Sequence, residues 1–441
     1  MQNLSDPPAG SVMIVNPGVQ PELQRMAEGL ERTGDLQSYV TAFSVGRDWT
    51  LPKWAVMFPN KIENKIMKQV SRRILDIPDV RIDRTSIISE AAFMALHKGN
   101  RFSGLQNFLL TFRNLDSQRS ASRNVLESTQ VIVGRSTSAM TIFRAAKELG
   151  VTTLLDYPIA HHNWSNRQIQ REIQSFPEFQ ESLSSEIISP ENCTALDQEL
   201  STADHILAFN DFHAQTFIEM GVDPSKIMVQ HLGVDLEVFH PPTSPRVGER
   251  PFRVLFVGQL TQRKGIGYAL RAFQAANIEN SELIFVGRSI GRSADILSQD
   301  PRVQCIPHVD RRDLTSLYHT ADVFLFPSIV EGFAQTPLEA MASGVPVLTS
   351  ANAVGNSLLT EDYANFLVDP RDVPRISELL RQLHQNPGLR QKLAVKGMHL
   401  AQAFDNRKVS PLLARVALSV GSQQKRRVSA NRTTQSPPAK S

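Results

Sequence analysis

The chain is poor in the features that mark secreted and membrane-spanning proteins. Its 441 residues include only two cysteines, Cys193 and Cys305, which stand far apart and outside any CxxC spacing, so we expect neither a disulfide framework nor a cysteine metal site. No apolar run approaches the roughly 20 residues of a membrane span. Residues 1–10 lack the pattern of a signal peptide. These absences predict a cytoplasmic protein.

The chain also carries little net charge. The net charge is +3, but residues 423–441 hold five basic residues and no acid, so the rest of the chain sums to −2. A nearly neutral body offers no electrostatic surface for nucleic acid, and we expect no nucleic-acid partner. The basic end is rich in Ser, Thr, Gln and Pro, so we predict a disordered tail at 421–441 and a flexible N-terminus at 1–10.

Short apolar runs alternate with helical stretches along the whole chain, which is typical of parallel sheets with crossover helices. A hydrophobic content of 41% suits large buried cores. The expected strands are residues 12–15, 39–43, 131–133, 152–155, 206–209, 227–229, 253–257, 283–286, 303–306, 323–326, 345–348 and 366–368. The proline-rich residues 240–250 interrupt the pattern. We therefore predict an α/β fold with two doubly wound domains, at 11–240 and 251–406.

Two glutamates with seven residues between them, Glu331 and Glu339, lie in the run VEGFAQTPLEAMASGVPVL at 330–348. Thr336 is expected to cap a short helix that begins at Pro337, with Glu339 completing a capping box. Free N–H groups at the start of that helix would attract an anion. The simpler alternative is that Glu339 only caps the helix and Glu331 is a solvated loop acid.

The same run resembles the EGFG-x3-LEAMA-x-G-x-PV signature of the retaining GT-B glycosyltransferases of group 1, a glycosyltransferase family 4-like group. The resemblance implies two Rossmann-like domains that face each other across a cleft. It also implies that the first domain holds the acceptor, the second holds the nucleotide sugar, and a last helix at 407–420 packs back on the first domain. Residues 203–241 resemble the segment that ends the first domain in this family.

The resemblance assigns donor-binding roles around the two glutamates. Glu339 would accept hydrogen bonds from the ribose hydroxyls, as a carboxylate does readily. Glu331, the expected catalytic carboxylate, would contact the sugar and phosphate together with the backbone of three residues. Those three residues are Gly332, Phe333 and Ala334, the last of which stands where the family usually has glycine.

A second basic segment follows the expected strand at 253–257. In the family this loop reads GR-x4-KG, and here Lys264 matches the family lysine while Gln259 occupies the first basic position. Arg263 can supply the missing guanidinium from the neighbouring position. Loop lysines and arginines are most often merely solvated. Because the segment accompanies the glutamate run, we predict Gln259, Arg263 and Lys264 to be donor-binding residues.

Acceptor-side candidates lie in the first half. Gly18 follows the first strand, in a loop that resembles the family loop near the reaction centre. His161 and His162 follow the strand at 152–155, and by resemblance one of them contacts the reacting region; His161 is favoured as the catalytic residue. Each histidine could instead be a structural hydrogen-bonding group. The chain has no D-x-D tripeptide, so we predict a metal-independent enzyme without a cofactor.

These expectations describe a hexosyltransferase that moves a sugar from a nucleotide-diphosphate-sugar donor to an acceptor hydroxyl with retention, in polysaccharide, glycolipid or related glycoconjugate biosynthesis. The alternatives are a non-catalytic nucleotide-sugar-binding or scaffold protein with this fold, and a nucleotide-sugar epimerase. Residues 61–75 and 101–123 mix basic and apolar residues at helical spacing. They predict peripheral contact with the inner face of a membrane and a lipid-linked acceptor, beside sugar and small-molecule acceptors. The simpler reading is a surface helix that packs its apolar stripe inward.

Overall fold

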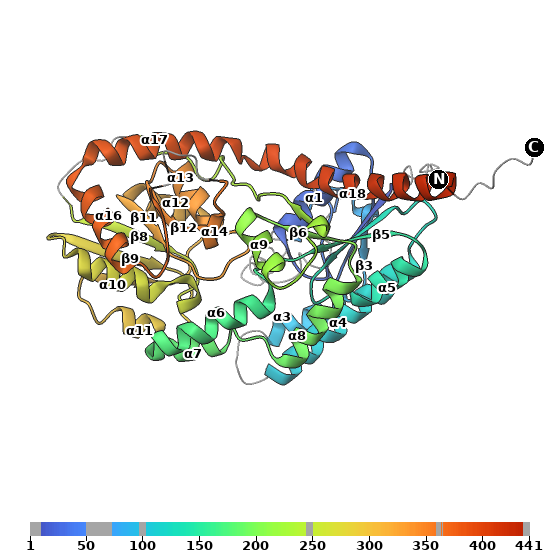
Figure 1. Ribbon diagram of the computed structural model, residues 1–441, viewed down its shortest axis with the longest axis horizontal. Coiled ribbons are helices and arrows are strands. Elements are labelled where there is room, and N and C mark those ends of the chain that lie inside the picture. Colours follow the sequence, from blue (N-terminus) through green and yellow to red (C-terminus); the bar gives the residue numbers. More distant parts are fainter. Residues whose placement is uncertain are drawn as a thin grey trace, which may run out of the picture. The chain divides into compact units, whose positions relative to one another are not determined.

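The protein is built on two β-sheets. Among the described residues, the paired strands of both sheets run parallel. The computed structural model describes residues 10–49, 73–96, 103–243, 250–358, 363 and 365–434. One sheet has seven strands in the order β3-β2-β1-β4-β5-β6-β7, and the other has six in the order β10-β9-β8-β11-β12-β13 (Figure 1). Helices connect the strands, as expected for parallel sheets.

The strands are β1 Val12–Val15, β2 Leu36–Thr41, β3 Ile82–Arg84, β4 Val131–Arg135, β5 Thr152–Asp156, β6 His205–Ala208, β7 Ile227–Val229, β8 Phe252–Val257, β9 Ser281–Val286, β10 Val303–Ile306, β11 Val323–Phe326, β12 Val347–Ser350 and β13 Leu367–Val368. The α-helices are α1 Pro21–Thr33, α3 Ile87–Leu96, α4 Ser103–Arg123, α5 Met140–Glu148, α6 His162–Ser175, α7 Gln180–Ser184, α8 Pro190–Thr202, α9 Asp211–Glu219, α10 Ile266–Ala276, α11 Ser293–Leu297, α12 Arg311–Thr320, α13 Thr336–Ala342, α14 Ala351–Val354, α16 Val373–Gln385, α17 Pro387–Ala403 and α18 Asn406–Thr434.

The prediction of two parallel α/β sheets is confirmed. Each of the twelve expected strands coincides with an observed strand, although β12 begins two residues later than expected and β2 three residues earlier. The strand β3 was not predicted, because three residues, Ile82–Arg84, give no readable alternation. The second sheet has the strand order typical of a Rossmann fold. The direction of that order reverses between β8 and β11.

The chain divides into two compact units. The first comprises residues 1–156, 194–207 and 410–441, and the second comprises 157–193 and 208–409. In this division, residues 157–193 and 208–240 group with the second unit. The domain boundaries proposed from the sequence stay predictions.

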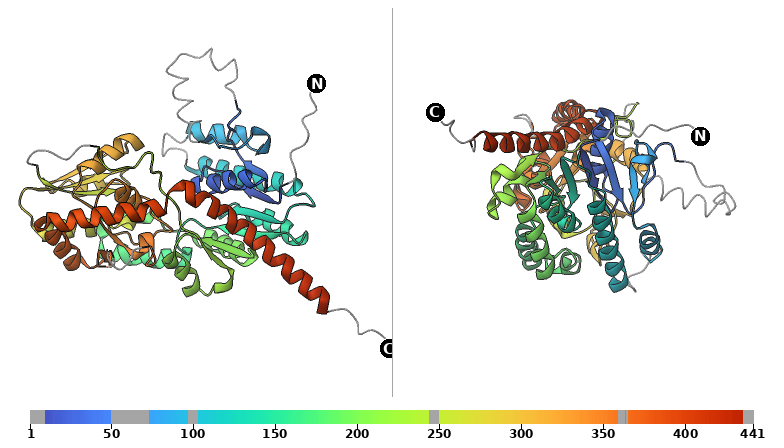
Figure 2. Two further views of the ribbon diagram at one scale, coloured as in Figure 1. Left: turned by 90° about the horizontal axis from the view of Figure 1, so that it is seen from above. Right: turned by 90° about the vertical axis from the view of Figure 1, so that its right-hand side faces the viewer.

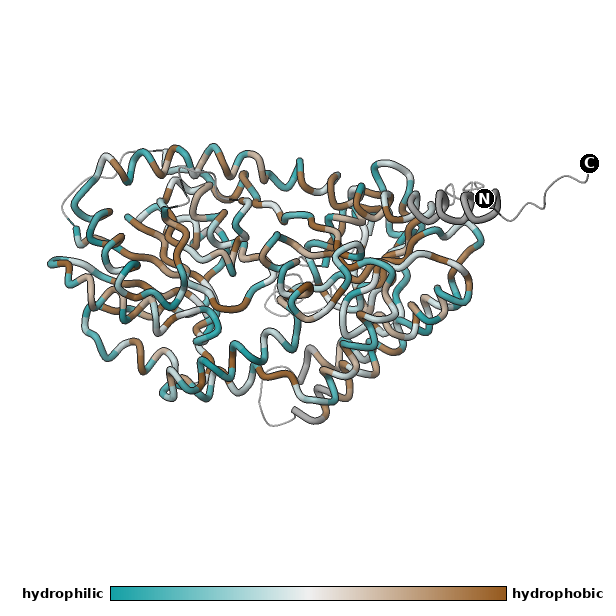
Figure 3. Tube along the Cα trace, viewed as in Figure 1, coloured by the Kyte–Doolittle hydropathy of each residue, from teal (hydrophilic) through white to brown (hydrophobic). Residues whose placement is uncertain are grey.

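The core of the second unit is formed by β8, β9, β11 and β12. Every residue of β11 and β12 is buried, and the Phe256 ring packs against those of Phe285 and Phe326. Figure 3 shows hydrophobic residues concentrated along these strands, while the surrounding helices alternate between hydrophobic and hydrophilic residues. Burying both faces in this way is typical of a parallel sheet.

The helix α18 packs on the first unit beyond Ser410. A side chain added at Gly29 of α1 would lie 2.7 Å from the Ser410 carbonyl oxygen, so the two helices are in close contact. The helix, red in Figure 2, continues to Thr434, past residue 421 where the sequence predicts a disordered tail. Most of the basic stretch 61–75 lies outside the described residues. Within the described residues, no helix is long and apolar enough to cross a bilayer.

Candidate functional site

The candidate site lies at the carboxyl ends of β8 and β11, two neighbouring strands of the second sheet. The order of the sheet reverses between them, which is where ligands bind in open α/β sheets. A 3₁₀ turn, η7 Gln262–Lys264, follows β8 and ends at Gly265. Gly265 has a φ of +77°, and an added Cβ would lie 1.9 Å from the Pro327 carbonyl oxygen. Only glycine therefore lets η7 lie directly against the end of β11.

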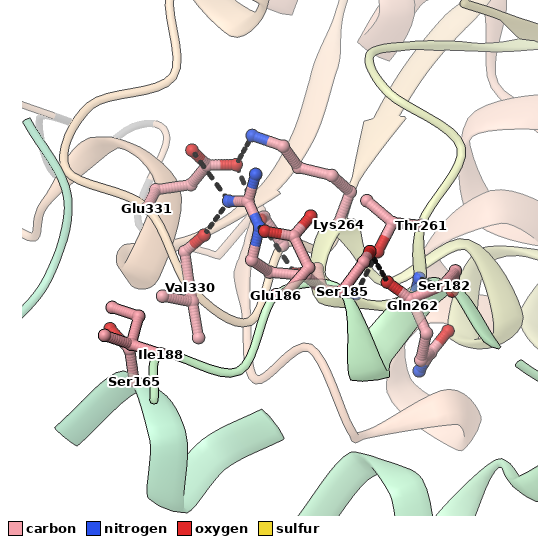
Figure 4. Close-up of polar contacts among 12 residues, drawn as sticks. Ser165, Ser182, Ser185, Glu186, Ile188, Thr261, Gln262, Lys264, Val330 and Glu331 are labelled. Atoms are coloured by element: carbon pink, nitrogen blue, oxygen red, sulfur yellow. Dashed lines mark hydrogen bonds and ion pairs between the residues drawn. The ribbon is translucent and has the colours of Figure 1, made fainter. Parts of the chain in front are cut away.

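This close approach joins Lys264 to Glu331. The Lys264 ammonium forms an ion pair with the Glu331 carboxylate, and the two side chains point toward each other in Figure 4. The hydroxyl of Ser328 donates to the same carboxylate at 2.9 Å. The N–H of Ile329 donates to the Arg263 carbonyl at 2.9 Å, which ties η7 to the loop after β11.

Arg263 is also turned toward this loop. Its guanidinium donates to the Val330 carbonyl at 2.7 Å and lies 3.8 Å from the Glu331 carboxylate. Its Nε also pairs with the Glu186 carboxylate at 3.1 Å. Two cations, Arg263 and Lys264, and two carboxylates, Glu186 and Glu331, therefore lie close together. Gln259 is half-buried in the same loop, and the donor-binding roles of Gln259 and Arg263 stay predictions.

The electrostatics of Glu331 follow from these contacts. Burial by itself would raise the pKa of the carboxyl, but Lys264, Arg263 and the Ser328 hydroxyl outweigh burial and hold the pKa below its usual value. Glu331 is therefore an anion at neutral pH. The charge of Glu331 is thus balanced by neighbouring cations within the protein.

The Glu331 loop is tied to the segment before α6. The N–H of Ala160 donates to the Glu331 carbonyl at 3.1 Å. An added Cβ at Gly332 would lie 2.1 Å from the Pro158 carbonyl oxygen, so the absence of a side chain permits this contact. Asn210, which caps α9, donates to the Gly332 carbonyl at 2.7 Å. The structure thus holds Glu331 and Gly332 beside the residues that lead into His161.

The backbone of the predicted phosphate loop is only partly available to a ligand. The N–H of Ala334 donates to the Ala353 carbonyl at 2.8 Å and is therefore engaged within the protein. In the part of the chain that the structure describes, the N–H groups of Gly332 and Phe333 donate to no backbone acceptor. Phe333 is buried and packs edge-on against His231.

Glu339 lies in α13, and its expected capping box is wrong. The helix begins at Thr336, and the cap position is Gln335, whose side chain makes no capping hydrogen bond. The Glu339 N–H donates to the Gln335 carbonyl instead. Its carboxylate accepts a hydrogen bond at 3.1 Å from the buried Tyr318 hydroxyl. The reason for the difference is that Gln335 already has helical backbone angles, which starts the helix one residue early.

The two predicted histidines stack on each other with ring centres 4.2 Å apart. His161 caps α6 and its Nδ1 accepts from the Asn163 N–H at 3.2 Å. Burial, together with His162 and Arg167, lowers the pKa of His161 to about 3. His162 is fully buried, and its Nδ1 lies 3.0 Å from the Tyr157 hydroxyl. His161 is therefore neutral at physiological pH, so any role in chemistry is that of a neutral hydrogen-bonding group.

The second unit brings together most of the predicted site residues, and it adds some that sequence reasoning missed. Gly18 lies in the first unit, and its acceptor-side role stays a prediction. The missed residues are Glu186, Ser328 and Asn210. Ser328 and Asn210 directly follow the apolar runs of β11 and β6, so their place at strand ends was a usable signal. Glu186 follows the short helix α7 and carries no local signal.

Part of the chain matches a known protein family. Residues 243–399 match the family model described as glycosyl transferases group 1. The D-inositol 3-phosphate glycosyltransferase of Mycobacterium tuberculosis is 33% identical over 177 residues, a match that spans 35% of this chain and 35% of that protein. The match therefore covers about a third of the relative's length.

Solved structures share the whole fold. Sucrose-phosphate synthase from Thermosynechococcus elongatus is 18% identical and aligns over 95% of this chain and 97% of its own, with a TM-score of 0.58. HepE from Anabaena, solved in complex with UDP and glucose, is 15% identical and aligns over 93% and 100%, with a TM-score of 0.59. At these identities the likeness establishes the fold. Residues 243–399 are thus similar to the group 1 glycosyltransferases, and the chain has the GT-B fold.

Proposed function

We propose that this protein transfers a sugar from a nucleotide-diphosphate donor to an acceptor hydroxyl, with retention at the anomeric carbon and without a metal ion. The observation that carries the proposal is the meeting of Lys264, Arg263 and Glu331 at the carboxyl ends of β8 and β11. A departing diphosphate is stabilised by cations beside it, and a carboxylate can accept hydrogen bonds from the sugar hydroxyls. This cluster supplies both.

The leaving group explains why two cations are needed. When the bond from the anomeric carbon to the diphosphate oxygen breaks, negative charge grows on that oxygen. Lys264 and Arg263 then stabilise the diphosphate, and the N–H groups of Gly332 and Phe333, which donate to no backbone acceptor among the described residues, add neutral donors. Because protein cations fill this role, the proposed reaction requires no divalent metal.

Retention follows from a front-face reaction in this proposal. The acceptor oxygen bonds to the anomeric carbon on the side from which the diphosphate leaves. The hydroxyl proton moves to the departing phosphate oxygen, so atoms and charge balance without a side-chain nucleophile. Glu331 orients the sugar hydroxyls, and neutral His161 offers a hydrogen bond beside them. Glu339 accepts from the ribose hydroxyls next to the Tyr318 hydroxyl.

The structural neighbour HepE, solved with UDP and glucose, supports a nucleotide-sugar donor. We therefore place UDP first among the nucleotides to be tested, followed by GDP, ADP and TDP.

A lipid-linked acceptor is favoured by one surface of the first unit. Three apolar side chains at helical spacing on α4 are exposed: Leu105 by 47%, Phe108 by 64% and Phe112 by 51%. Ile88 of the neighbouring helix α3 is 86% exposed. Arg119 and Arg123 are exposed further along α4, so apolar and basic groups occur on one helix. Co-sedimentation with vesicles that contain anionic lipid, compared with Phe108→Ser, tests this part of the proposal.

The proposed reaction is tested with the full chain and a panel of UDP-, GDP-, ADP- and TDP-sugars. Thermal shift identifies the donor, because a bound ligand raises the melting temperature by mass action. Donor hydrolysis or transfer is then followed in the presence of EDTA, and NMR of the product reports the anomeric configuration. Turnover with retention that Glu331→Gln reduces by at least about 100-fold supports the proposal. Binding without turnover over a broad acceptor panel, turnover abolished by EDTA, or inversion contradicts it.

A further inference from the structure

A second carboxylate, Glu172 in the last turn of α6, lies behind the candidate site and is fully buried. Gln262 donates to one of its oxygens at 3.0 Å. Arg371 donates to the other at 3.0 Å and makes an ion pair at 2.8 Å, and the Tyr268 hydroxyl lies 3.4 Å away. A buried carboxylate is unfavourable unless it is paired and hydrogen-bonded, and here three side chains from separate segments satisfy it.

Gln262 connects this carboxylate to the site. Its amide nitrogen donates to Glu172, and its amide oxygen accepts from the Gly267 N–H at 2.8 Å. The side chain is fully buried and bonded at both ends, so it has little rotational freedom. Arg263 and Lys264 follow directly within η7. The two hydrogen bonds of Gln262 therefore set where these cations lie relative to α6.

The helix α6 also carries the other half of the site. His161 caps its first turn, and Ala160 just before it donates to the Glu331 carbonyl. Glu172 is ten residues beyond the first residue of α6, which corresponds to about 15 Å along a helix. One helix thus contacts the Glu331 loop at its start and η7 near its end.

We infer that Glu172 is a positioning residue for the donor diphosphate. It acts through Gln262 and holds Lys264 and Arg263 at the distance from Glu331 that the diphosphate requires. This inference rests on the proposed function, because it assigns Glu172 to the same site. Arg371 neutralises Glu172, so its carboxylate does not oppose the anionic ligand.

The test measures the affinity of the full chain for UDP by calorimetry. Glu172→Gln replaces the acceptor with an amide whose NH₂ group faces other donors, and we expect UDP affinity to fall on the order of tenfold. In the swapped variant Glu172→Gln with Gln262→Glu, the amide at 172 donates to a carboxylate at 262. This swap should restore affinity to within about threefold of the wild type. Glu178→Gln is the matched control, since Glu178 forms an exposed ion pair with Arg271 and its loss should leave affinity unchanged.

The possible outcomes test the role of Glu172 separately from the proposed function. Wild-type affinity in Glu172→Gln, with only the melting temperature lowered, would show that Glu172 stabilises the fold and does not position the cations. A folded swap that does not recover UDP binding would overturn the inference too. If Glu172→Gln does not fold, Gln262→Met breaks the same link while the Glu172–Arg371 pair remains, and should show the same loss. Absence of UDP, GDP, ADP and TDP binding in the wild type contradicts the proposed function itself.

Discussion

Lys264 and Glu331 form a buried ion pair in which the lysine side chain is 15% exposed and the glutamate 8%. Each charge is stabilised mainly by the other, so the pair is sensitive to loss of one partner. In the proposed reaction the same lysine binds the donor diphosphate. The ion pair therefore stabilises the free protein, and in the proposed reaction Lys264 contacts both Glu331 and the donor diphosphate.

The stability of this pair can be tested by removing one charge and then both. Lys264→Met leaves Glu331 buried with fewer cations, and we expect the free energy of unfolding to fall by about 3 kcal/mol. The double variant Lys264→Met with Glu331→Gln removes both charges and should recover most of that loss. Urea denaturation at pH 7 measures both values. A double variant no more stable than Lys264→Met would show that the pair makes no coupled contribution.

The role of Glu339 is separated from that of the cations by the choice of ligand. If Glu339 binds ribose, Glu339→Gln should weaken UDP binding by about tenfold and leave pyrophosphate binding unchanged, because pyrophosphate has no ribose. Lys264→Met should weaken both. Tyr318→Phe removes the hydroxyl that donates to Glu339 and should give a smaller loss for UDP alone. Equal losses for UDP and pyrophosphate in Glu339→Gln would place the carboxylate beside the phosphates.

Neutral His161 predicts a specific pH dependence of stability. Its pKa in the folded chain is about 3, below the usual value near 6.5, so between these values the unfolded chain binds a proton that the folded chain does not. Stability is therefore lost as the pH falls, by about 2 kcal/mol between pH 7 and pH 5 from this residue. His161→Asn keeps a good helix cap and removes the titration. Urea denaturation at both pH values should show a smaller loss for the variant; an equal loss would contradict the buried neutral state.

The close approach at Gly265 predicts an unequal response of two glycines with positive φ. Gly221 has a φ of +88° and open space around an added Cβ, so Gly221→Ala should cost about 1 kcal/mol from backbone strain alone. Gly265→Ala adds a contact of 1.9 Å with the Pro327 carbonyl and should cost about 1–3 kcal/mol more. It should also reduce UDP affinity, since η7 must shift. Equal stability of the two variants would contradict the tight packing of η7 on β11.

The sequence was informative where local rules operate. Apolar runs located both sheets, and the glutamate run with Lys264 located the candidate site, because strand ends in a parallel sheet meet at one edge. The missed features depend on long-range contacts. Glu186 pairs with Arg263, and Glu172 accepts a hydrogen bond from Gln262. The partners are nearly 80 to 90 residues apart in the chain, and no local pattern encodes such pairing. The capping box failed because a helix start depends on the backbone angles of Gln335, which propensity alone does not determine.

The central claim is that the cations of η7, facing Glu331, bind the donor diphosphate. Calorimetric titration of UDP into the full chain tests it most directly, with Lys264→Met as the variant and Lys147→Met, an exposed lysine of α5, as the control. The account predicts binding by the wild type and the control, weakened by added salt, and a loss of about 10- to 100-fold in Lys264→Met. Equal UDP affinity in the wild type and a folded Lys264→Met would contradict it.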